Sequence, residues 1–236
     1  MPNKTAVVSG GTKGIGKAIV AKFMENGFDV ITCSRNQNDL DALKDETVAA
    51  TYQGKLFTFK SDLSKKDEVI DFAKYIQTKS DHVDVLVNNA GVFLPGEMST
   101  EKEGSLEFMI NTNLYSAYHL TRSLIQGMIA SKSGDIFNIC SVASKMAYPN
   151  GGSYSISKFA MYGMSKGLRE ELKPHGIRVT AVLPGATYTA SWDGVDLPED
   201  RFIKPEDVAE AVWSAYSLSR NSVVEDLIIR PQLGDI

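Results

Sequence analysis

The sequence has few residues that bind metals or form disulfides. It contains two cysteines and three histidines in 236 residues. Cys33 and Cys140 form no CxxC pair, and the histidines are scattered singly along the chain. The sequence therefore predicts neither a zinc site nor a disulfide framework.

Long apolar runs and an excess of positive charge are also missing. No stretch approaches the roughly eighteen apolar residues of a membrane-spanning helix, and the apolar stretch near the N-terminus is too short for a signal peptide. The 25 Lys and Arg residues are outnumbered by 29 Asp and Glu residues. We therefore expect a cytoplasmic protein that has no nucleic acid and no membrane among its partners.

Short β-rich runs alternate with helical patterns along the whole chain, and no Pro-, Gly- or Ser-rich linker divides it. The predicted strands are Thr5–Ser9, Asp29–Cys33, Leu56–Lys60, Val83–Asn88, Asp135–Cys140, Arg178–Leu183 and Glu225–Arg230. The predicted helices are Gly16–Asn26, Asp39–Glu46, Lys65–Lys79, Leu106–Ser131, Tyr154–Pro174 and Pro205–Ser217. This alternation predicts a single α/β domain over residues 1–236, a three-layer doubly wound Rossmann sandwich with a seven-stranded parallel sheet.

Ligands of such folds bind at the carboxyl ends of the strands, and the first such position is rich in glycine. The stretch "VVSGGTKGIGKAI" joins the first strand to the first helix. Glycine permits a tight turn there and lets the backbone approach a pyrophosphate held by the helix N-terminal amides. We predict a phosphate cradle rather than a simple turn, with cofactor contacts from Gly10, Thr12, Lys13, Gly14, Ile15 and Gly16.

The end of the second strand indicates which dinucleotide is bound. An acidic residue there would bind the ribose 2′-hydroxyl of NAD, but the sequence has Ser34 and Arg35. A guanidinium can bind a 2′-phosphate with two hydrogen bonds, and Lys13 could add a second cation. We therefore predict NADP(H), with two solvated surface cations as the alternative.

The fourth strand ends in "LVNNAGVF", which predicts either a turn or a further cofactor contact through Asn89, Ala90 and Gly91. Four motifs now stand in a fixed order: Ser9-Gly-x-x-x-Gly-Ile-Gly16, Asn88-Asn-Ala-Gly91, Tyr154-x-x-x-Lys158 and Pro184-Gly185. In this order and spacing the chain resembles the short-chain dehydrogenase/reductase family from the first strand to about residue 190.

The resemblance decides among three Tyr-x-x-x-Lys matches, which begin at Tyr75, Tyr154 and Tyr162. In the family, a serine after the fifth strand, a tyrosine thirteen residues later and a lysine four beyond it form the active site. The resemblance thus implies a catalytic set of Asn113, Ser141, Tyr154 and Lys158, and the other two pairs are interpreted as packing and surface.

Each member of this set has an expected role. Tyr154 would donate a proton, Ser141 would hydrogen-bond the substrate oxygen, and Lys158 would lower the pKa of the phenol and hold the ribose. Asn113 would connect the site to solvent through a water near Lys158, as the resemblance implies. It also implies cofactor contacts from Asp62, Leu63, Pro184, Gly185, Thr187 and Thr189.

Departures from the family limit the choice of substrate. Ser9 replaces the usual threonine and Cys140 a usual serine, and the C-terminal "SVVEDLIIRPQLGDI" lacks the features of 3-oxoacyl-carrier-protein reductases. The substrate-covering segment Ala186–Lys204 carries Tyr188 and Trp192, which suit a small hydrophobic or aromatic carbonyl compound.

The first hypothesis is therefore an NADPH-dependent carbonyl reductase. The alternatives are a 3-oxoacyl-carrier-protein reductase and a non-catalytic NADP-binding sensor, although a sensor has no need of a proton donor. By analogy with the family, we expect a homodimer or homotetramer formed through the two long helices.

Overall fold

Seven parallel strands form one sheet in the order β3-β2-β1-β4-β5-β6-β7. The computed structural model describes residues 3–192 and 194–236. The strands are β1 (Thr5–Ser9), β2 (Asp29–Ser34), β3 (Leu56–Lys60), β4 (Val85–Asn88), β5 (Gly134–Ile139), β6 (Ile177–Pro184) and β7 (Asp226–Ile229). The predicted fold class is confirmed, and the strand order reverses between β1 and β4, where doubly wound sheets bind their ligands.

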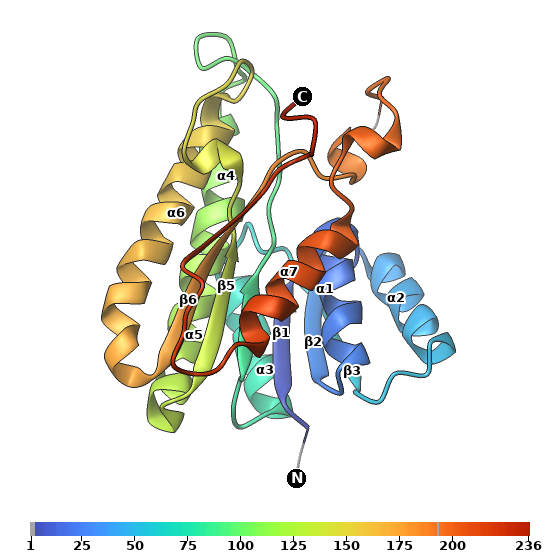
Figure 1. Cartoon of the computed structure of the whole chain (residues 1–236), viewed down its shortest axis with the longest axis vertical. Helices are drawn as coiled ribbons and strands as arrows, with labels where there is room; N and C mark the ends of the chain where they lie inside the picture. Colours follow the sequence, from blue (N-terminus) through green and yellow to red (C-terminus); the bar gives the residue numbers. More distant parts are fainter. Residues whose placement is uncertain (1–2, 193) are drawn as a thin grey trace.

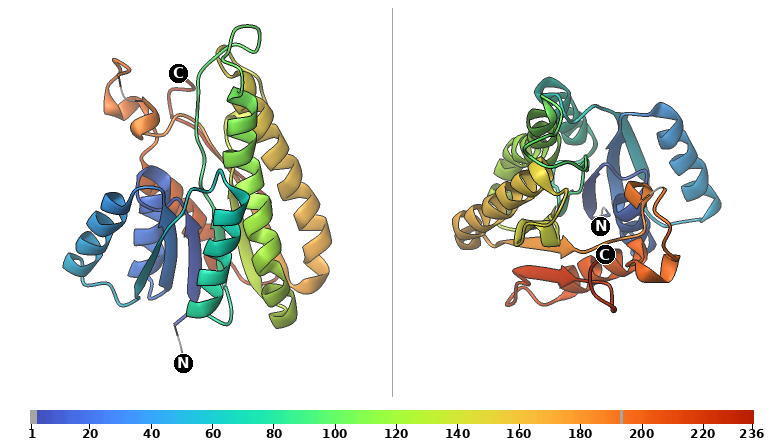
Figure 2. Two further views of the ribbon diagram at one scale, coloured as in Figure 1. Left: turned by 180° about the vertical axis from the view of Figure 1, so that it is seen from behind. Right: turned by 90° about the horizontal axis from the view of Figure 1, so that it is seen from above.

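Helices cover both faces of the sheet (Figures 1 and 2). Helices α1 (Gly14–Glu25), α2 (Gln37–Ala49) and α7 (Pro205–Ser217) pack on one face, where Phe23, Leu43 and Val212 share one buried cluster with β1 and β4. Helices α3 (Lys66–Lys79), α5 (Ser116–Ser131) and α6 (Gly152–Leu172) cover the other face. Because apolar side chains cover both faces, the central strands read as continuous apolar runs such as "TAVVS" and "VLVN".

The predicted helix Leu106–Ser131 is interrupted in the structure. It consists of α4 (Ser105–Ile110), a π-helical turn η1 (Asn111–Tyr115) and α5. A π turn widens the helix by one residue and is frequent at functional sites. Here it lies in the segment that carries the buried Thr112 and Asn113.

Three further observations complete the fold. Helix α6 begins at Gly152, two residues before the predicted start, and a short 3₁₀ turn at Lys173–His175 follows it. No helix among residues 3–192 and 194–236 is both long enough and apolar enough to cross a membrane. The strands point toward the end of the molecule at which the C-terminus lies (Figure 1).

Candidate active site

A cavity of about 1090 Å³ opens at the carboxyl ends of the strands. It is lined by all the predicted site residues except Asn113. The predicted residues in its wall are Gly10, Thr12, Lys13, Gly14, Ile15, Gly16, Ser34, Arg35, Asp62, Leu63, Asn89, Ala90, Gly91, Ser141, Tyr154, Lys158, Pro184, Gly185, Thr187 and Thr189. Residues that are far apart in the sequence, such as Gly10 and Thr189, therefore line the same cavity.

The glycine turn has the geometry of a phosphate cradle. Gly10 and Gly14 adopt left-handed backbone angles, with φ of 68° and 51°. A Cβ on Gly16 would lie 2.3 Å from the carbonyl oxygen of Gly10, so only glycine fits there. No side chain caps the N-terminus of α1, which leaves its first amides available to an anion. These residues fit the pyrophosphate of a dinucleotide.

Hydrogen bonds tie this turn to the Asn-Asn-Ala-Gly segment. The side-chain amide of Asn89 donates to the carbonyl oxygens of Ser9 and Gly10, both at 3.0 Å. The Ser9 hydroxyl accepts from the backbone amides of Asn89 and Ala90 at 2.9 and 3.0 Å. The serine that replaces the usual threonine therefore holds the two loops together.

The predicted 2′-phosphate site has one unpaired cation and one paired cation. Arg35 is exposed, and its guanidinium makes no hydrogen bond or ion pair among the described residues. The Lys13 ammonium instead lies 2.9 Å from an Asp39 carboxylate oxygen. The geometry thus favours Arg35 as the main anion-binding group, with Lys13 shared between Asp39 and any bound phosphate.

Asp62 presents a stable negative charge to the cavity wall. Burial acts to raise the pKa of its carboxyl, but hydrogen bonds from Ser64 and the charges of Lys65 and Arg35 outweigh it, so that the pKa is lowered. One carboxylate oxygen accepts from both the amide and the hydroxyl of Ser64, at 3.1 and 2.8 Å.

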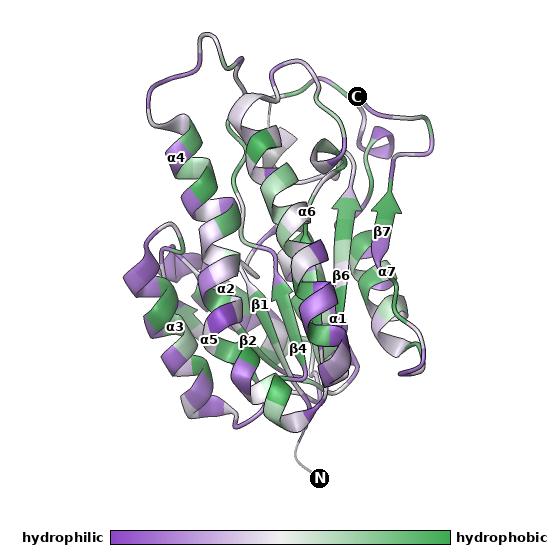
Figure 3. Ribbon diagram, turned by 90° about the vertical axis from the view of Figure 1, so that its left-hand side faces the viewer, coloured by the Kyte–Doolittle hydropathy of each residue, from purple (hydrophilic) through white to green (hydrophobic). Residues whose placement is uncertain are grey.

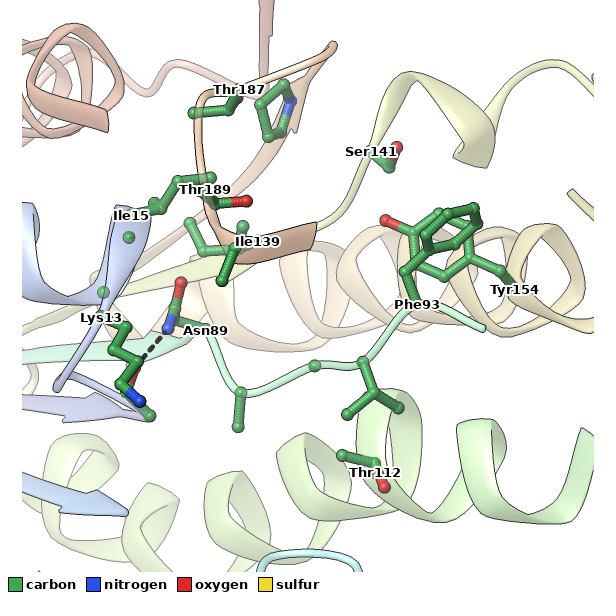
Figure 4. A pocket seen from close by; sticks show the side chains of 18 of the residues that line it. Lys13, Ile15, Asn89, Phe93, Thr112, Ile139, Ser141, Tyr154, Thr187 and Thr189 are labelled. Atoms are coloured by element: carbon green, nitrogen blue, oxygen red, sulfur yellow. Dashed lines mark hydrogen bonds between the residues drawn. The ribbon is translucent and has the colours of Figure 1, made fainter. Parts of the chain in front are cut away.

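Tyr154 and Lys158 lie one turn apart near the start of α6. The Lys158 ammonium is 5.7 Å from the centre of the Tyr154 ring and donates to the Ile139 carbonyl oxygen at 2.8 Å. The Phe93 ring meets the Tyr154 ring edge-on, with centroids 4.9 Å apart. Figure 4 shows Tyr154, Phe93 and Ser141 on one side of the cavity, with Lys13, Ile15 and Asn89 on the other.

The pKa of Tyr154 is shifted in the opposite direction from the one that the sequence predicts. Burial raises the pKa of the Tyr154 phenol to about 12, and interaction with the Ser141 hydroxyl only partly offsets this. Burial also lowers the pKa of Lys158. In the chain alone, desolvation therefore outweighs any lowering of the phenol pKa by Lys158.

Asn113 stands behind the cavity wall rather than in it. Its side chain is fully buried, and its carbonyl oxygen accepts from the amide of Val92 at 2.7 Å. Its amide group donates to the Val92 carbonyl oxygen and the Ser157 hydroxyl, at 3.0 and 2.9 Å. A Cβ on Gly91 would lie 3.4 Å from the Asn113 oxygen and 3.5 Å from the Lys158 nitrogen, so the backbone passes close to both. The proton-relay role stays a prediction.

The other two Tyr-x-x-x-Lys pairs lie outside the cavity wall. Tyr162 donates a 2.5 Å hydrogen bond to Asp226, and the Lys166 ammonium lies over its ring at 4.6 Å. Tyr75 packs on Phe59, with ring centroids 4.8 Å apart. The interpretation of these pairs as packing and surface agrees with this placement.

Several cavity residues carry no motif in the sequence. Phe93 lies in the loop after β4, Met146 and Tyr148 lie between Ser141 and Tyr154, and the C-terminal Asp235 and Ile236 reach the cavity from the segment after β7. The apolar and aromatic character of the first three is their only signal in the sequence. The C-terminal pair is found only from the tertiary structure.

The substrate-covering segment is partly corrected by the structure. Trp192 lines the cavity, but Tyr188 does not. Both rings pack on Phe202, with centroids 5.2 Å away for Trp192 and 5.7 Å away for Tyr188. Residue 193 of this segment lies outside the described residues.

Both cysteines, Cys33 and Cys140, are buried free thiols. The Cys140 sulfur lies 3.9 Å from the Ser165 hydroxyl. Within residues 3–192 and 194–236, no group of three or more His, Cys, Asp or Glu side chains could hold a metal ion.

Comparison with known proteins finds relatives over nearly the whole chain. The family model described as short chain dehydrogenase matches residues 4–199. A sepiapterin reductase from Chlorobaculum tepidum is 35% identical over 239 aligned positions, covering 98% of this chain and 97% of the relative.

Solved structures resemble the whole chain. A metagenomic short-chain oxidoreductase in complex with NADP is 33% identical, with a TM-score of 0.84 and 97% of each chain covered. A variant of the actinorhodin polyketide ketoreductase with NADPH is 26% identical, with a TM-score of 0.88 and coverage of 99% of this chain and 98% of its own.

Proposed function

Because the chain belongs to the short-chain dehydrogenase family, we propose that this oxidoreductase uses NADP(H) to reduce a carbonyl compound to an alcohol. One observation carries the proposal: a single cavity is lined by the glycine turn, by the unpaired Arg35, and by Ser141, Tyr154 and Lys158. The NADP-bound and NADPH-bound structures that resemble this chain support the choice of cofactor.

When bound, the dinucleotide supplies a hydride to the carbonyl carbon. The chain supplies the proton and orients the carbonyl group of the substrate. Ser141 holds the carbonyl oxygen with a hydrogen bond, and Tyr154 donates its phenolic proton to the oxygen as negative charge develops. Lys158, whose ammonium is already fixed by the Ile139 carbonyl, lies beside the ring and stabilises the resulting phenolate.

At neutral pH the Tyr154 phenol holds the proton that a reduction consumes. With its pKa raised to about 12 by burial, the phenol remains protonated at neutral pH. A phenol with the usual pKa near 10 is also protonated at neutral pH, so the proton that reduction requires is present with or without this shift. Oxidation of an alcohol needs the phenolate and is favoured only at higher pH.

The lining of the cavity supports a small hydrophobic or aromatic ketone or aldehyde as the substrate. In addition to Tyr154, the cavity wall contains the side chains of Phe93, Met146, Tyr148 and Trp192. Flat apolar side chains around a few convergent polar groups favour flat apolar substrates. The relative named as a reductase of sepiapterin supports a carbonyl substrate of this kind.

A homodimer formed through α4, α5 and α6 is the second part of the proposal. These helices share one side of the molecule, and α4 and α6 carry apolar segments among polar ones (Figure 3). Tyr115 and Phe159 are 48% and 46% exposed there, and the exposed apolar residues also include Leu106, Tyr118 and Ile156. An apolar patch of this kind is typical of an interface between subunits.

A substrate panel tests the reaction. The purified chain is assayed with NADPH and with NADH against diketones, aromatic aldehydes, cyclic aromatic ketones and an acetoacetyl thioester. Turnover of the first three classes with NADPH supports the proposal, and preference for the thioester favours the 3-oxoacyl-carrier-protein reductase. Tight NADPH binding without turnover of any compound would favour the non-catalytic sensor.

A further inference from the structure

The helix that carries Tyr154 and Lys158 has no cap of its own. Helix α6 is 21 residues long, but its N-cap residue is Gly151, and its first turn contains no acidic side chain. The first four amides of a helix need acceptors, and a carboxylate at this end is favoured by the helix dipole. In this structure the carboxylate comes from a distant segment, through Glu101.

Glu101 contacts Ser153, which directly precedes Tyr154. The Ser153 hydroxyl donates to one carboxylate oxygen of Glu101, and the Ser153 amide lies 3.5 Å from the other. The two residues are 52 positions apart in the sequence. Ser153 is buried and Glu101 is half-buried, so this contact is partly shielded from water.

The backbone around this contact is closely fitted. The amide of Gly96 donates to the Asn150 carbonyl oxygen at 3.0 Å, and Gly96 forms an isolated bridge with Gly151. A Cβ on Gly152 would lie 2.4 Å from the Gly96 carbonyl oxygen. Glycine at 152 therefore lets the segment 92–101 lie directly against the start of α6.

The other end of the same segment is also tied to α6. Val92 exchanges two hydrogen bonds with the Asn113 side chain, which in turn donates to the Ser157 hydroxyl. Ser157 directly precedes Lys158, as Ser153 precedes Tyr154. Serines four positions apart lie on one face of a helix, so both ends of segment 92–101 are held by the same face of α6.

Segment 92–101 forms one wall of the substrate side of the cavity. Val92 and Phe93 line the cavity, and Phe93 packs edge-on against the Tyr154 ring. We propose that Glu101 is a positioning residue: through Ser153 it holds the wall that contains Phe93 against the start of α6, and thereby fixes the Tyr154 ring relative to the substrate. The role in turnover rests on the function proposed above.

A neighbouring carboxylate makes a matched comparison. Glu97 lies four residues earlier in the same loop, but its side chain is exposed and makes no hydrogen bond or ion pair among the described residues. If Glu101 acted only through its negative charge on the loop, removal of either side chain would have similar effects. If it acts through Ser153, only the Glu101 substitution should matter.

The kinetic test uses Glu101→Ala, Ser153→Ala, the double variant and Glu97→Ala as the control. We expect kcat to fall about tenfold to a hundredfold in each single variant, because small displacements of reacting groups have effects of this size. The double variant should be no slower than the slower single variant, since both remove one contact. Glu101→Gln keeps an acceptor oxygen for Ser153 and should restore most of kcat.

A positioning role is separated from loss of folding by cofactor binding. The glycine turn and Arg35 lie on the other side of the cavity, so NADPH affinity and the circular dichroism spectrum should stay unchanged in Glu101→Ala. A loss of kcat together with NADPH affinity would mean that the substitution disturbs the whole fold, and it would overturn the assignment. So would additive effects of Glu101→Ala and Ser153→Ala.

Limited proteolysis tests the contact without any turnover. Lys102 is the only Lys or Arg between residues 92 and 104, and it is exposed. Trypsin should cleave after Lys102 faster in Glu101→Ala and Ser153→Ala than in wild type, but not in Glu97→Ala. Equal cleavage rates in all four proteins would overturn the inference. If the two variants are cleaved faster but the wild type reduces no carbonyl compound, the proposed function is refuted while the contact stands.

Discussion

Two tyrosines of helix α6 with the same local sequence pattern have different surroundings. Tyr154 lines the cavity beside Lys158, whereas Tyr162 donates its hydrogen bond to Asp226 outside it. The same substitution in both residues therefore separates chemistry from stability. Each change to phenylalanine removes one hydroxyl group and nothing else.

We expect Tyr154→Phe to lower kcat by about 10²- to 10⁴-fold, because the general acid is lost. Its NADPH affinity and stability should remain close to wild type. Tyr162→Phe should keep its activity but lower the free energy of unfolding by about 1 to 3 kcal/mol, because it breaks a hydrogen bond to a charged group. Steady-state kinetics and urea unfolding measure both effects, and an inactive Tyr162→Phe beside an active Tyr154→Phe would refute the site.

We expect one residue, Arg35, to determine the preference for NADPH over NADH. It lines the cavity at the end of β2 and makes no ion pair among the described residues, whereas Lys13 is paired with Asp39. Any 2′-phosphate would therefore gain more from Arg35 than from Lys13.

In Arg35→Asp we expect the Kd for NADPH to rise about tenfold to a hundredfold, which corresponds to loss of a charge-assisted hydrogen bond. The Kd for NADH should fall or stay constant, because the new carboxylate accepts from the 2′-hydroxyl. Lys13→Ala should have a smaller effect. Fluorescence titration with both dinucleotides measures this, and equal wild-type affinities for NADH and NADPH would refute the NADP(H) assignment.

Glycines illustrate how the same residue type serves different elements. Gly16 lies where α1 meets the turn after β1, and a Cβ there would lie 2.3 Å from a backbone oxygen. Gly127 lies within α5, and a Cβ there would meet nothing within 4 Å. One glycine is required by a close approach, and the other only weakens its helix.

Gly16→Ala should therefore lower stability by about 1 to 3 kcal/mol through overpacking and should weaken NADPH binding as well. Gly127→Ala should raise stability by about 1 kcal/mol, because alanine has the higher helix propensity, with no change in cofactor affinity. Thermal unfolding with and without NADPH measures both. A stabilised Gly16→Ala that binds NADPH normally would contradict the cradle geometry.

The π turn between α4 and α5 carries one buried polar side chain, that of Asn113, in a fully paired setting. Both polar groups of the Asn113 side chain are used: its oxygen binds the Val92 amide, and its amide group binds the Val92 carbonyl and Ser157. A buried Asn is costly unless its polar atoms are satisfied. The widened turn lies at the position where this side chain reaches the loop after β4 and α6 together.

For the whole molecule, the prediction concerns assembly through α4, α5 and α6. We expect Phe159→Arg to convert an oligomer into a monomer, because it places a charge in the apolar patch defined by Leu106, Tyr115, Tyr118, Ile156 and Phe159. Val48→Arg is the control, since Val48 is 78% exposed on α2, away from this face. Light scattering after size-exclusion chromatography measures the mass, and a monomeric wild type would refute the proposed dimer.

The local elements of this fold follow from the sequence alone. All seven strands are predicted with ends within two residues of those observed, and α7 is predicted with the observed bounds. Continuous apolar runs separated by helical periodicity are a local signal, so they can be read without knowing the tertiary contacts. The glycine turn and the choice of Tyr154 over Tyr162 likewise depend on the order of motifs along the chain.

The tertiary structure decided how these residues interact. The sequence did not indicate that the Glu101 carboxylate would accept from the Ser153 hydroxyl, that Asp235 would line the cavity, or that Asn113 would stand behind its wall. These are contacts between distant segments, and they depend on the packing of the whole molecule. The pKa of Tyr154 likewise rises to about 12 because the folded chain partly desolvates the phenol. Burial is a property of the folded structure, so a sequence motif can identify the proton donor but cannot predict its pKa.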